Sequence, residues 1–563
     1  MFPSIQSETS TPFRSPATTA NMIHPRQLLW VVVVAACGLA WANRFIQDDA
    51  FISLRYAQNL VEGHGLVWNP GGDRVEGYTN FLWTVILALP IWAGVDPFMF
   101  ISVLGVAMLA CTLLATYGLA IFLFCKDKIA LLATAIAGAN YSFSCYATGG
   151  LETQLQTLLL TTCMVLAAWA ERCRAIGVPV LCAFSFLSAL AVLTRLDSGL
   201  LVAIIGLVMC WVTWQKSATT SDAIGRLIVL AAPFAAIVSG WLVWKIFYYG
   251  DFLPNTFYVK AENASPVRGF YYVGLFLAVY LFFPFLALFA GNLKRVGQEM
   301  GAGLAAMVFL SLAAWIAYVI KVGGDFMEFR FMVPIIPLIA IAVAWTIDRY
   351  CQYSRTRACA ITVLCGLSML HAFAFDRMPW KRSIESIRDL KYHISDPSSN
   401  WIGIGRFLGT YFKNDPSVVI AVTPAGAIPF FSRLTSIDML GLNDRWIARH
   451  GVKLSDRAGH HKITTVAHLV DAGATFVIGH PTMMADTSVP IQGISLDQLQ
   501  TMFVGKPVPD PTGIPLGTKV VLMPIAPHKY LLAIYLTPTP HVDRLLAEFG
   551  WDMVPILEVD AKR

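Results

Sequence analysis

Long apolar stretches separated by short polar connections dominate the first two thirds of the chain. A helix that crosses the hydrocarbon core of a bilayer needs about 20 mostly apolar residues. Stretches of roughly this length lie at residues 27–45, 98–124, 128–146, 151–170, 176–194, 198–214, 227–248, 271–291, 302–320, 329–347 and 358–375. The pattern predicts a polytopic α-helical membrane protein with about 11 transmembrane helices.

Basic residues recur at alternate connections between these stretches, which indicates an orientation. They are Arg14, Arg26, Lys126, Lys128, Arg172, Arg174, Lys216, Arg226, Lys294, Arg295, Arg349, Arg355 and Arg357. Because cytoplasmic loops carry an excess of Lys and Arg, these connections and the N-terminus are expected in the cytoplasm. The alternation requires that the apolar stretch 81–94 lies along the membrane surface, a role that suits Trp83, Pro90 and Trp92.

The last third of the chain differs from the rest. Its apolar runs shorten to strand length at 417–422, 474–478, 519–523 and 530–535, with helical patterns at 381–394, 400–412 and 541–548. We therefore expect a soluble α/β domain. The expected domains are a cytoplasmic leader (1–26), a transmembrane catalytic domain (27–376, with its first outer loop at 46–97) and a periplasmic α/β domain (377–563).

Composition supports a membrane protein and argues against two other classes. The chain is 56% hydrophobic and only 13% charged, whereas about a quarter of the residues in soluble domains are charged. The net charge of +6 is spread over many short loops, so nucleic acid is not an expected partner. All 11 cysteines lie at or before Cys365, without metal-ligand spacing, and the adjacent His460 and His461 are interpreted as solvated loop residues rather than a zinc site.

The first outer loop begins with two adjacent aspartates, Asp48 and Asp49. Like charges in a low dielectric raise one another's pKa, so such a pair at the mouth of a membrane helix is costly and typical of a functional site. A positioned carboxylate takes the proton from a hydroxyl nucleophile. The alternative is structural: Asp48 caps the helix that follows it and Asp49 pairs with Arg55. We favour catalysis, with Asp48 slightly ahead of Asp49 as the base.

Several motifs on the same predicted face resemble one family. They are residues 48–83, Gly-Gly-Leu-Glu-Thr at 149–153, Thr-Arg-Leu-Asp at 194–197, Leu-Pro-Asn-Thr-Phe-Tyr-Val-Lys at 253–260, Gly-Gly-Asp-Phe-Met-Glu-Phe-Arg-Phe at 323–331, Ala-Gly-Ala-Ile-Pro at 425–429 and 437–444 in the tail. In this order they resemble the GT-C glycosyltransferases, most closely the bacterial branch that includes the terminal arabinofuranosyltransferases of mycobacterial cell walls. The resemblance covers nearly the whole chain.

The resemblance implies an activity and a location. The expected reaction is an inverting transfer of a sugar, with arabinofuranose as the candidate, from a polyprenyl-phosphate donor to a cell-envelope glycan or glycolipid. It would occur on the periplasmic face of the bacterial inner membrane, so the expected partners are the lipid-linked donor, the glycan acceptor and membrane lipids. No cofactor is assigned, and a need for Mg²⁺ or Mn²⁺ stays open.

The resemblance also implies roles for the other polar residues of this face. Arg55, Arg195, Lys260 and Arg330 are expected to bind the donor and its phosphate, although basic residues near helix ends also act as interfacial anchors. Glu152, Glu76 and Asp325 are expected to orient the acceptor or bind a metal. Glu152 has an alternative role as an acid at a helix N-terminus, and Asp325 in its Gly-Gly-Asp turn is expected to hold Arg330 or bind sugar hydroxyls.

Two other classes of function remain as alternatives. A transporter also has many spans and intramembrane charges, but here the charges gather at one face rather than at the midplane. A polysaccharide-binding scaffold would leave the acidic pair without a role. We further expect the tail domain to cover the outer mouth of the site and bind a long glycan acceptor.

Overall fold

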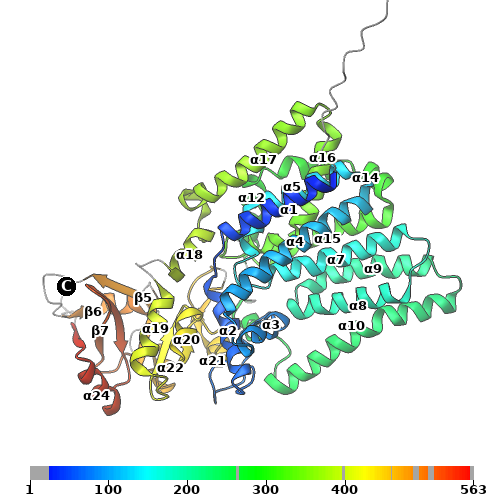
Figure 1. Ribbon diagram of the computed structural model, residues 1–563. Coiled ribbons are helices and arrows are strands. Elements are labelled where there is room, and N and C mark those ends of the chain that lie inside the picture. Colours follow the sequence, from blue (N-terminus) through cyan, green and yellow to red (C-terminus); the bar gives the residue numbers. More distant parts are fainter. Residues whose placement is uncertain are drawn as a thin grey trace, which may run out of the picture.

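The computed structural model describes residues 25–260, 265–395, 400–457, 459–485, 493–504 and 513–557. A bundle of long helices is joined to a smaller domain that contains the β-strands (Figure 1). Among the described residues, eight helical segments are long and apolar enough to cross a membrane. They are α1 (Pro25–Ala42), α4 (Pro97–Phe124), α7 (Thr153–Arg172), α9 (Ser198–Gln215), α10 (Thr220–Tyr249), α15 (Ala302–Lys321), η2 with α16 (Arg330–Ile335 and Ile336–Tyr350) and α17 (Ser354–Ala374).

The remaining expected spans are shorter or broken. Helices α12 (Pro266–Val279) and α13 (Phe283–Gly291) meet at an angle of 97° and pass the same test only as a pair. The stretch 128–146 is divided into α5 (Asp127–Ala139) and α6 (Tyr141–Tyr146) at Asn140, whose side chain accepts a hydrogen bond from the Phe143 amide and caps α6. Helix α8 (Val178–Thr194) has only 17 residues. The polytopic helical fold is confirmed, while the number of about 11 crossings stays a prediction.

The predicted cytoplasmic connections lie together at one end of the bundle. Lys126 is 3.8 Å from Glu299 in α14 (Leu293–Met300) and 3.7 Å from Asp348 at the end of α16. Arg172 donates to the Phe122 carbonyl at 2.9 Å. These contacts bring together connections that carry basic residues, and their cytoplasmic location stays a prediction.

The first outer loop folds at the opposite end. It contains α2 (Asp48–Val61) and α3 (Phe81–Trp92). Helix α3 has 12 residues, fewer than the roughly 20 that a crossing requires. Its length therefore suits the predicted surface helix. The short helix α11 (Asn255–Lys260) lies in the connection after α10.

The tail forms an α/β domain around a mixed sheet, as predicted. The seven strands lie in the order β2-β1-β5-β8-β7-β9-β6, with β1 parallel to β2 and β5, and β8 antiparallel to β5 and β7. Their bounds are β1 (Val419–Val422), β2 (Thr435–Asp438), β5 (Phe476–Ala485), β6 (Ile494–Ser495), β7 (Lys519–Ala526), β8 (Lys529–Tyr535) and β9 (Asp552–Leu557), and β3 (Val452–Lys453) pairs separately with β4 (Lys462–Ile463). The helices are α18 (Ile387–Ser395), α19 (Trp401–Phe412), α20 (Ala427–Ser432), α21 (Arg445–His450), α22 (Val466–Asp471), α23 (Leu496–Val504) and α24 (Pro540–Phe549), preceded by two short 3₁₀ helices, η3 (Phe375–Arg377) and η4 (Pro379–Lys381).

The tail domain shares a hydrophobic core with the first outer loop. Buried residues of α2 and α3 pack in one cluster with buried residues of α19, α20 and the large sheet. The Phe51 ring of α2 lies 5.6 Å from the Phe430 ring and 5.5 Å from the Phe431 ring of α20. Figure 1 shows α2 and α20 next to each other between the bundle and the large sheet. Because apolar burial is the main favourable term in association, this shared core fixes the tail domain against the mouth of the bundle.

Candidate functional site

A cavity of about 680 Å³ opens at the end of the bundle that carries the first outer loop. Its charged lining comes from five parts of the chain that are distant in sequence: the first outer loop, the starts of α7 and α9, the end of α15 and the turn that leads into η2. The charged residues that line it are Asp49, Glu152, Arg195, Asp197, Lys321, Asp325 and Arg330. Folding therefore brings together five of the residues that the motifs predicted: Asp49, Glu152, Arg195, Asp325 and Arg330.

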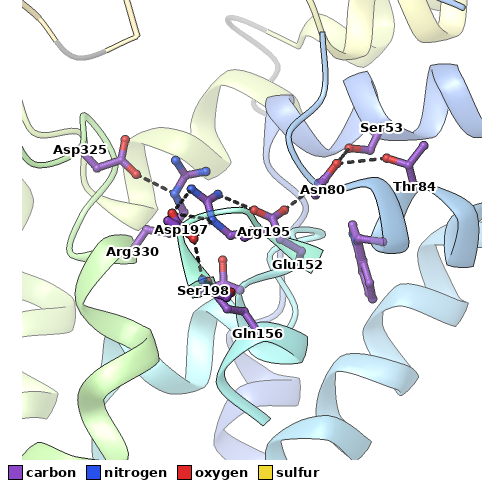
Figure 2. Close-up of polar contacts among 12 residues, drawn as sticks. Ser53, Asn80, Thr84, Glu152, Gln156, Arg195, Asp197, Ser198, Asp325 and Arg330 are labelled. Atoms are coloured by element: carbon purple, nitrogen blue, oxygen red, sulfur yellow. Dashed lines mark hydrogen bonds and ion pairs between the residues drawn. The ribbon is translucent and has the colours of Figure 1, made fainter. Parts of the chain in front are cut away.

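Arg195 is the centre of an ion-pair network in this cavity (Figure 2). One terminal nitrogen donates to Glu152 Oε1 at 2.6 Å, and the other donates to Asp197 Oδ2 at 2.7 Å. Tyr318 and Gln156 also donate to Asp197, at 3.1 Å and 2.8 Å. Burial alone would raise the pKa of both carboxyls, but the Arg195 charge and the hydrogen bonds to each carboxylate together outweigh burial, so the pKa of Glu152 and of Asp197 is lowered. Both acids are therefore held as anions.

Asn80 connects this network to the first outer loop. Its side-chain nitrogen donates to Glu152 Oε2 at 2.7 Å, while its side-chain oxygen accepts from Ser53 at 3.1 Å and Thr84 at 3.0 Å. Figure 2 shows Asn80 between Glu152 and these two hydroxyls. Glu152 directly precedes α7, so it occupies the helix-start position of the predicted alternative. Its carboxylate oxygens accept hydrogen bonds from Arg195 and Asn80.

Arg330 and Asp325 form the second charged pair of the cavity. The Arg330 Nε donates to Asp325 Oδ2 at 2.6 Å. The turn before Asp325 requires glycine: Gly324 has a φ of +72°, and a Cβ there would lie 2.7 Å from the Tyr272 side chain. Asp325 thus holds Arg330, one of the two roles that the sequence predicts for it.

A smaller cavity of about 300 Å³ lies beside the first, at the junction with the tail domain. Asp49 lines both cavities, together with Ile52, Leu442 and Gly459. The polar residues that line the smaller cavity are Gln47, Asp48, Asp49, Glu385, His393, Trp401, Thr423, Ser455, Arg457, His460 and His480. Asp49 is therefore the carboxylate that separates a charged cavity in the bundle from a second cavity shared with the tail domain.

Asp48 holds the tail domain in place. Its carboxylate accepts from the amides of Ala427 at 2.8 Å and Gly426 at 3.1 Å, which are the first amides of α20. A Cβ at Gly426 would lie 2.0 Å from the Asp48 carbonyl oxygen, so this approach requires glycine. Burial raises the pKa of Asp48 to about 7, although the two amides act in the opposite direction. The predicted capping role is thus present on a different helix, since α2 has no side-chain cap of its own.

Arg55 lies outside both cavity linings. Its guanidinium donates to the carbonyls of Trp68 at 2.8 Å, Leu434 at 2.9 Å and Pro429, and to the Asn69 side chain at 2.9 Å. Burial lowers the pKa of Arg55 to about 9. Because three of the acceptors are backbone carbonyls and two lie in the tail domain, these contacts join the first outer loop to the tail. The structure therefore does not bring Arg55 to the predicted donor site.

Glu76 also lies apart from the cluster. Glu76 pairs with Lys245 of α10 at 2.7 Å, and both side chains are almost completely buried. Burial raises the pKa of Glu76 to about 7 against the opposing charge of Lys245. Lys260 is the last residue of α11, and its side chain lies outside the described part of the chain.

The described residues do not provide a metal site. Within them, no group of three or more His, Cys, Asp or Glu side chains has an arrangement that could hold a metal ion. Glu152, Glu76 and Asp325, the predicted acceptor or metal residues, are engaged with Arg195, Lys245 and Arg330 respectively. A role for Mg²⁺ or Mn²⁺ therefore has no ligand set in this part of the chain.

The sequence-based assignment of roles leaves out many lining residues, among them Asp197, Lys321 and Gln47. Asp197 belongs to the Thr-Arg-Leu-Asp motif, and its position two residues after Arg195 is the sequence signal that indicates a role beside this arginine. Lys321 ends a span and has the pattern of an interfacial anchor. Gln47 directly precedes the acidic pair and is 1% exposed, but a neutral amide in a polar loop has no distinguishing pattern.

Comparisons with known proteins cover different parts of the chain. A family model described as a domain of unknown function (DUF8728) matches residues 388–515. The terminal β-(1→2)-arabinofuranosyltransferase of Mycobacterium tuberculosis is 27% identical over 366 residues, which cover 56% of this chain and 55% of that protein. The protein of the same name from Corynebacterium glutamicum is 30% identical over 343 residues, covering 54% and 47%. The chain thus spans about half the length of these curated relatives.

A solved structure has a similar fold over most of the chain. The crystal structure of ArnT from Cupriavidus metallidurans bound to undecaprenyl phosphate matches with a TM-score of 0.52 at 13% identity, and the match covers 90% of this chain and 97% of that one. At this identity the likeness concerns the fold.

Proposed function

We propose that this chain is a glycosyltransferase. It has the GT-C fold, and its sequence is similar to the terminal arabinofuranosyltransferase branch, as its motifs predict. It transfers a sugar, with arabinofuranose as the candidate, from a polyprenyl-phosphate donor to a cell-envelope glycan or glycolipid. The observation that carries this proposal is the position of Asp49, which lines both a cavity rich in guanidinium groups and a second cavity beside it. Two adjoining cavities with one carboxylate at their junction suit a reaction between two substrates.

The larger cavity suits the donor phosphate. Arg195 directs all three of its guanidinium nitrogens to Glu152 and Asp197. Arg330 uses Nε for Asp325, and Lys321 forms no ion pair within the described part of the chain. Arg330 and Lys321 are therefore the cations with donor capacity left for a phosphate, and Arg195 positions the two acids around them. A guanidinium grips phosphate oxygens with two nitrogens, and an ammonium adds a point charge.

The undecaprenyl phosphate named with the ArnT structure supports a donor of this class. A polyprenyl chain would lie in the hydrocarbon region while its phosphate reaches the end of the bundle, where the cavity opens. This proposal keeps the cavity on the periplasmic face of a bacterial inner membrane, with the basic connections in the cytoplasm.

Asp49 is placed to act as the general base. An acceptor hydroxyl oxygen attacks the anomeric carbon and forms the new carbon–oxygen bond, while the bond from that carbon to the phosphate oxygen breaks. The bonding pair leaves with the polyprenyl phosphate, and the hydroxyl proton moves to the Asp49 carboxylate. A single displacement inverts the configuration at the anomeric carbon. Asp48 is given a different role, because both of its carboxylate oxygens bind the start of α20.

The proposal is tested with two matched variants in membranes supplied with polyprenyl-phosphate arabinofuranose. Asp49→Asn is expected to lower transfer about 10³-fold, the range for a general base, while the protein still inserts and binds polyprenyl phosphate. Asp48→Asn exchanges one hydrogen-bond acceptor for a donor and is expected to lower transfer by no more than about tenfold. Radiolabelled product measures both effects.

Three outcomes contradict the proposal. Full activity of Asp49→Asn would reject the base, and a loss with Asp48→Asn that equals the loss with Asp49→Asn would reject the division of roles. Absence of sugar transfer by the wild-type protein, together with glycan binding, would favour a polysaccharide-binding scaffold. Movement of a solute across sealed vesicles without transfer would favour a transporter.

A further inference from the structure

The smaller cavity contains a buried amide whose hydrogen-bond donor has no partner. Gln47 is 1% exposed, and its Nε2 forms no hydrogen bond within the described part of the chain. A buried donor without a partner costs about 1–3 kcal/mol, and such groups in native structures call for an explanation. Since Gln47 lines this cavity beside Asp48 and Asp49, a ligand oxygen placed there would satisfy its donor.

The charges around the cavity select the kind of ligand. Its acids are Asp48, Asp49 and Glu385, whereas Arg457 is the only Arg or Lys in its lining, which consists of described residues, and it pairs with Glu385. Because the acids outnumber the guanidinium, an anionic ligand would be repelled. An apolar chain would leave the Gln47 amide unsatisfied. A neutral ligand that carries hydroxyl groups avoids both penalties.

Aromatic rings form one wall of the cavity. The His393 ring stacks on the Trp401 ring at 4.7 Å with planes 8° apart, and the His480 ring meets Trp401 edge-on at 6.1 Å. Burial lowers the pKa of His480, with the nearby His393 acting in the same direction, so His480 is held neutral at pH 7. Rings of this kind offer an apolar face together with a nitrogen that donates or accepts a hydrogen bond, which suits a sugar residue.

We propose that the smaller cavity is the acceptor subsite and binds the uncharged terminal sugar of a glycan, with Gln47 donating to an oxygen of that sugar next to the attacking hydroxyl. The inference rests on the proposed function and assigns a role to the domain of unknown function, which contributes His393, Trp401, Arg457 and His480. Gln47 acts as a positioning residue, because it orients the sugar whose hydroxyl is presented to Asp49.

The test separates a binding role of Gln47 from a structural one. In the full-length protein in lipid nanodiscs, Gln47→Leu removes the unsatisfied donor at similar volume. We expect the thermal midpoint to stay unchanged or rise, the KM and dissociation constant for an octyl arabinofuranosyl disaccharide to rise about tenfold, and undecaprenyl phosphate binding to stay unchanged. Unchanged disaccharide binding, or a fall in the midpoint together with all binding, would overturn the proposal.

A pair of histidine variants provides a second measurement. His480→Ala changes the ring wall and is expected to weaken disaccharide binding severalfold. His450→Ala removes an exposed histidine of the same domain that lies outside both cavity linings, and it is expected to change nothing. Equal effects of the two variants would contradict an acceptor subsite at this wall.

Further measurements distinguish a wrong subsite assignment from a wrong proposed function. The same disaccharide with a terminal phosphate is expected to bind at least tenfold more weakly, and tighter binding would overturn the assignment to an uncharged sugar. If the neutral disaccharide does not bind while the protein still transfers sugar to another acceptor in an Asp49-dependent manner, the subsite assignment is wrong and the proposed function stands. If no acceptor receives sugar, the proposed function itself is wrong.

Discussion

The two cavities that meet at Asp49 are built on opposite principles. In the larger one most of the charged groups are paired before any ligand arrives: Arg195 with Glu152 and Asp197, and Arg330 with Asp325. In the smaller one a buried amide donor has no partner. The first arrangement keeps charges fixed in place, whereas the second leaves a bond to be completed by the ligand.

With this difference, one site would suit the two chemically different substrates of the proposed reaction. A phosphate leaving group gains charge during the reaction, and preorganised charges stabilise it without reorganisation at that moment. A neutral sugar acceptor offers only hydroxyl groups, and a site with an unsatisfied donor discriminates strongly in favour of a ligand that completes the bond. Substitutions of the paired charges in the larger cavity should therefore affect folding as well as activity, while those in the smaller one should affect mainly acceptor binding.

The largest effect is expected for the central cation of the larger cavity. Arg195→Met leaves Glu152 and Asp197 buried without their partner, and breaking a buried pair costs about 3–5 kcal/mol. We therefore expect a clear fall in the thermal midpoint of the purified protein in detergent. Adding Glu152→Gln to the same variant removes one uncompensated charge and should recover part of the loss.

The matched comparison is Arg330→Met, which leaves only Asp325 without a cation. Its loss of stability should be smaller than that of Arg195→Met. If the two variants unfold at the same temperature as the wild-type protein, the paired charges are not what fixes this cavity.

An intermediate effect is expected for Lys321, which lines the same cavity without an ion pair in the described part of the chain. Lys321→Ala should raise the KM for the lipid donor about tenfold, because one contact to a charged phosphate contributes about 1.5–3 kcal/mol at most. Stability should change by less than about 0.5 kcal/mol, as for other surface substitutions. Donor titrations in nanodiscs measure the first effect.

Lys128→Ala is the control for this prediction, since Lys128 is an exposed lysine near the start of α5, at the end of the bundle with the basic connections. It should leave the donor KM unchanged. A donor KM that is equally insensitive to both substitutions would remove Lys321 from the phosphate site and leave Arg330 as its cation.

Part of this comparison was predictable from the sequence because polar residues in apolar surroundings are conspicuous. Arg195 and Arg330 lie next to spans, and Asp325 follows two glycines, so their motifs indicate the residues of the larger cavity. Strand-length apolar runs predict the α/β tail and locate β1, β5, β7 and β8, but not β2, β3, β4, β6 or β9. In β2, Thr-Ser-Ile-Asp at 435–438 has too few apolar residues to form a pattern.

The smaller cavity was not predictable, because it depends on contacts between distant parts of the chain. Asp48 meets Gly426 and Ala427 across 378 and 379 residues, and Arg55 meets Leu434 across 379. A sequence motif indicates that a residue is unusual, but its partner is set by tertiary packing. For the same reason Glu76 was placed with the acids of the site, although its partner Lys245 lies within an apolar stretch on α10.

The last effect depends on pH and is expected from Asp48, which lines the smaller cavity and binds the tail domain. Its pKa rises from 3.8 to about 7 in the folded protein because of burial. The folded state therefore binds more protons than the unfolded state between about pH 4 and pH 7, so the contribution of Asp48 to stability is fully present below pH 4 and is lost as the pH rises to about 7. The slope is at most about 1.4 kcal/mol per pH unit.

Asp48→Asn isolates this slope, because buried acids that do not interact with Asp48 titrate equally in both proteins. Glu76, whose pKa burial raises to about 7, is an example. Thermal midpoints of the wild-type and variant proteins between pH 4 and pH 7.5 should therefore converge as the pH rises, with the wild type losing its advantage. Parallel curves would mean that Asp48 is already ionised at pH 4, and the amides of α20 would then outweigh burial in setting its charge.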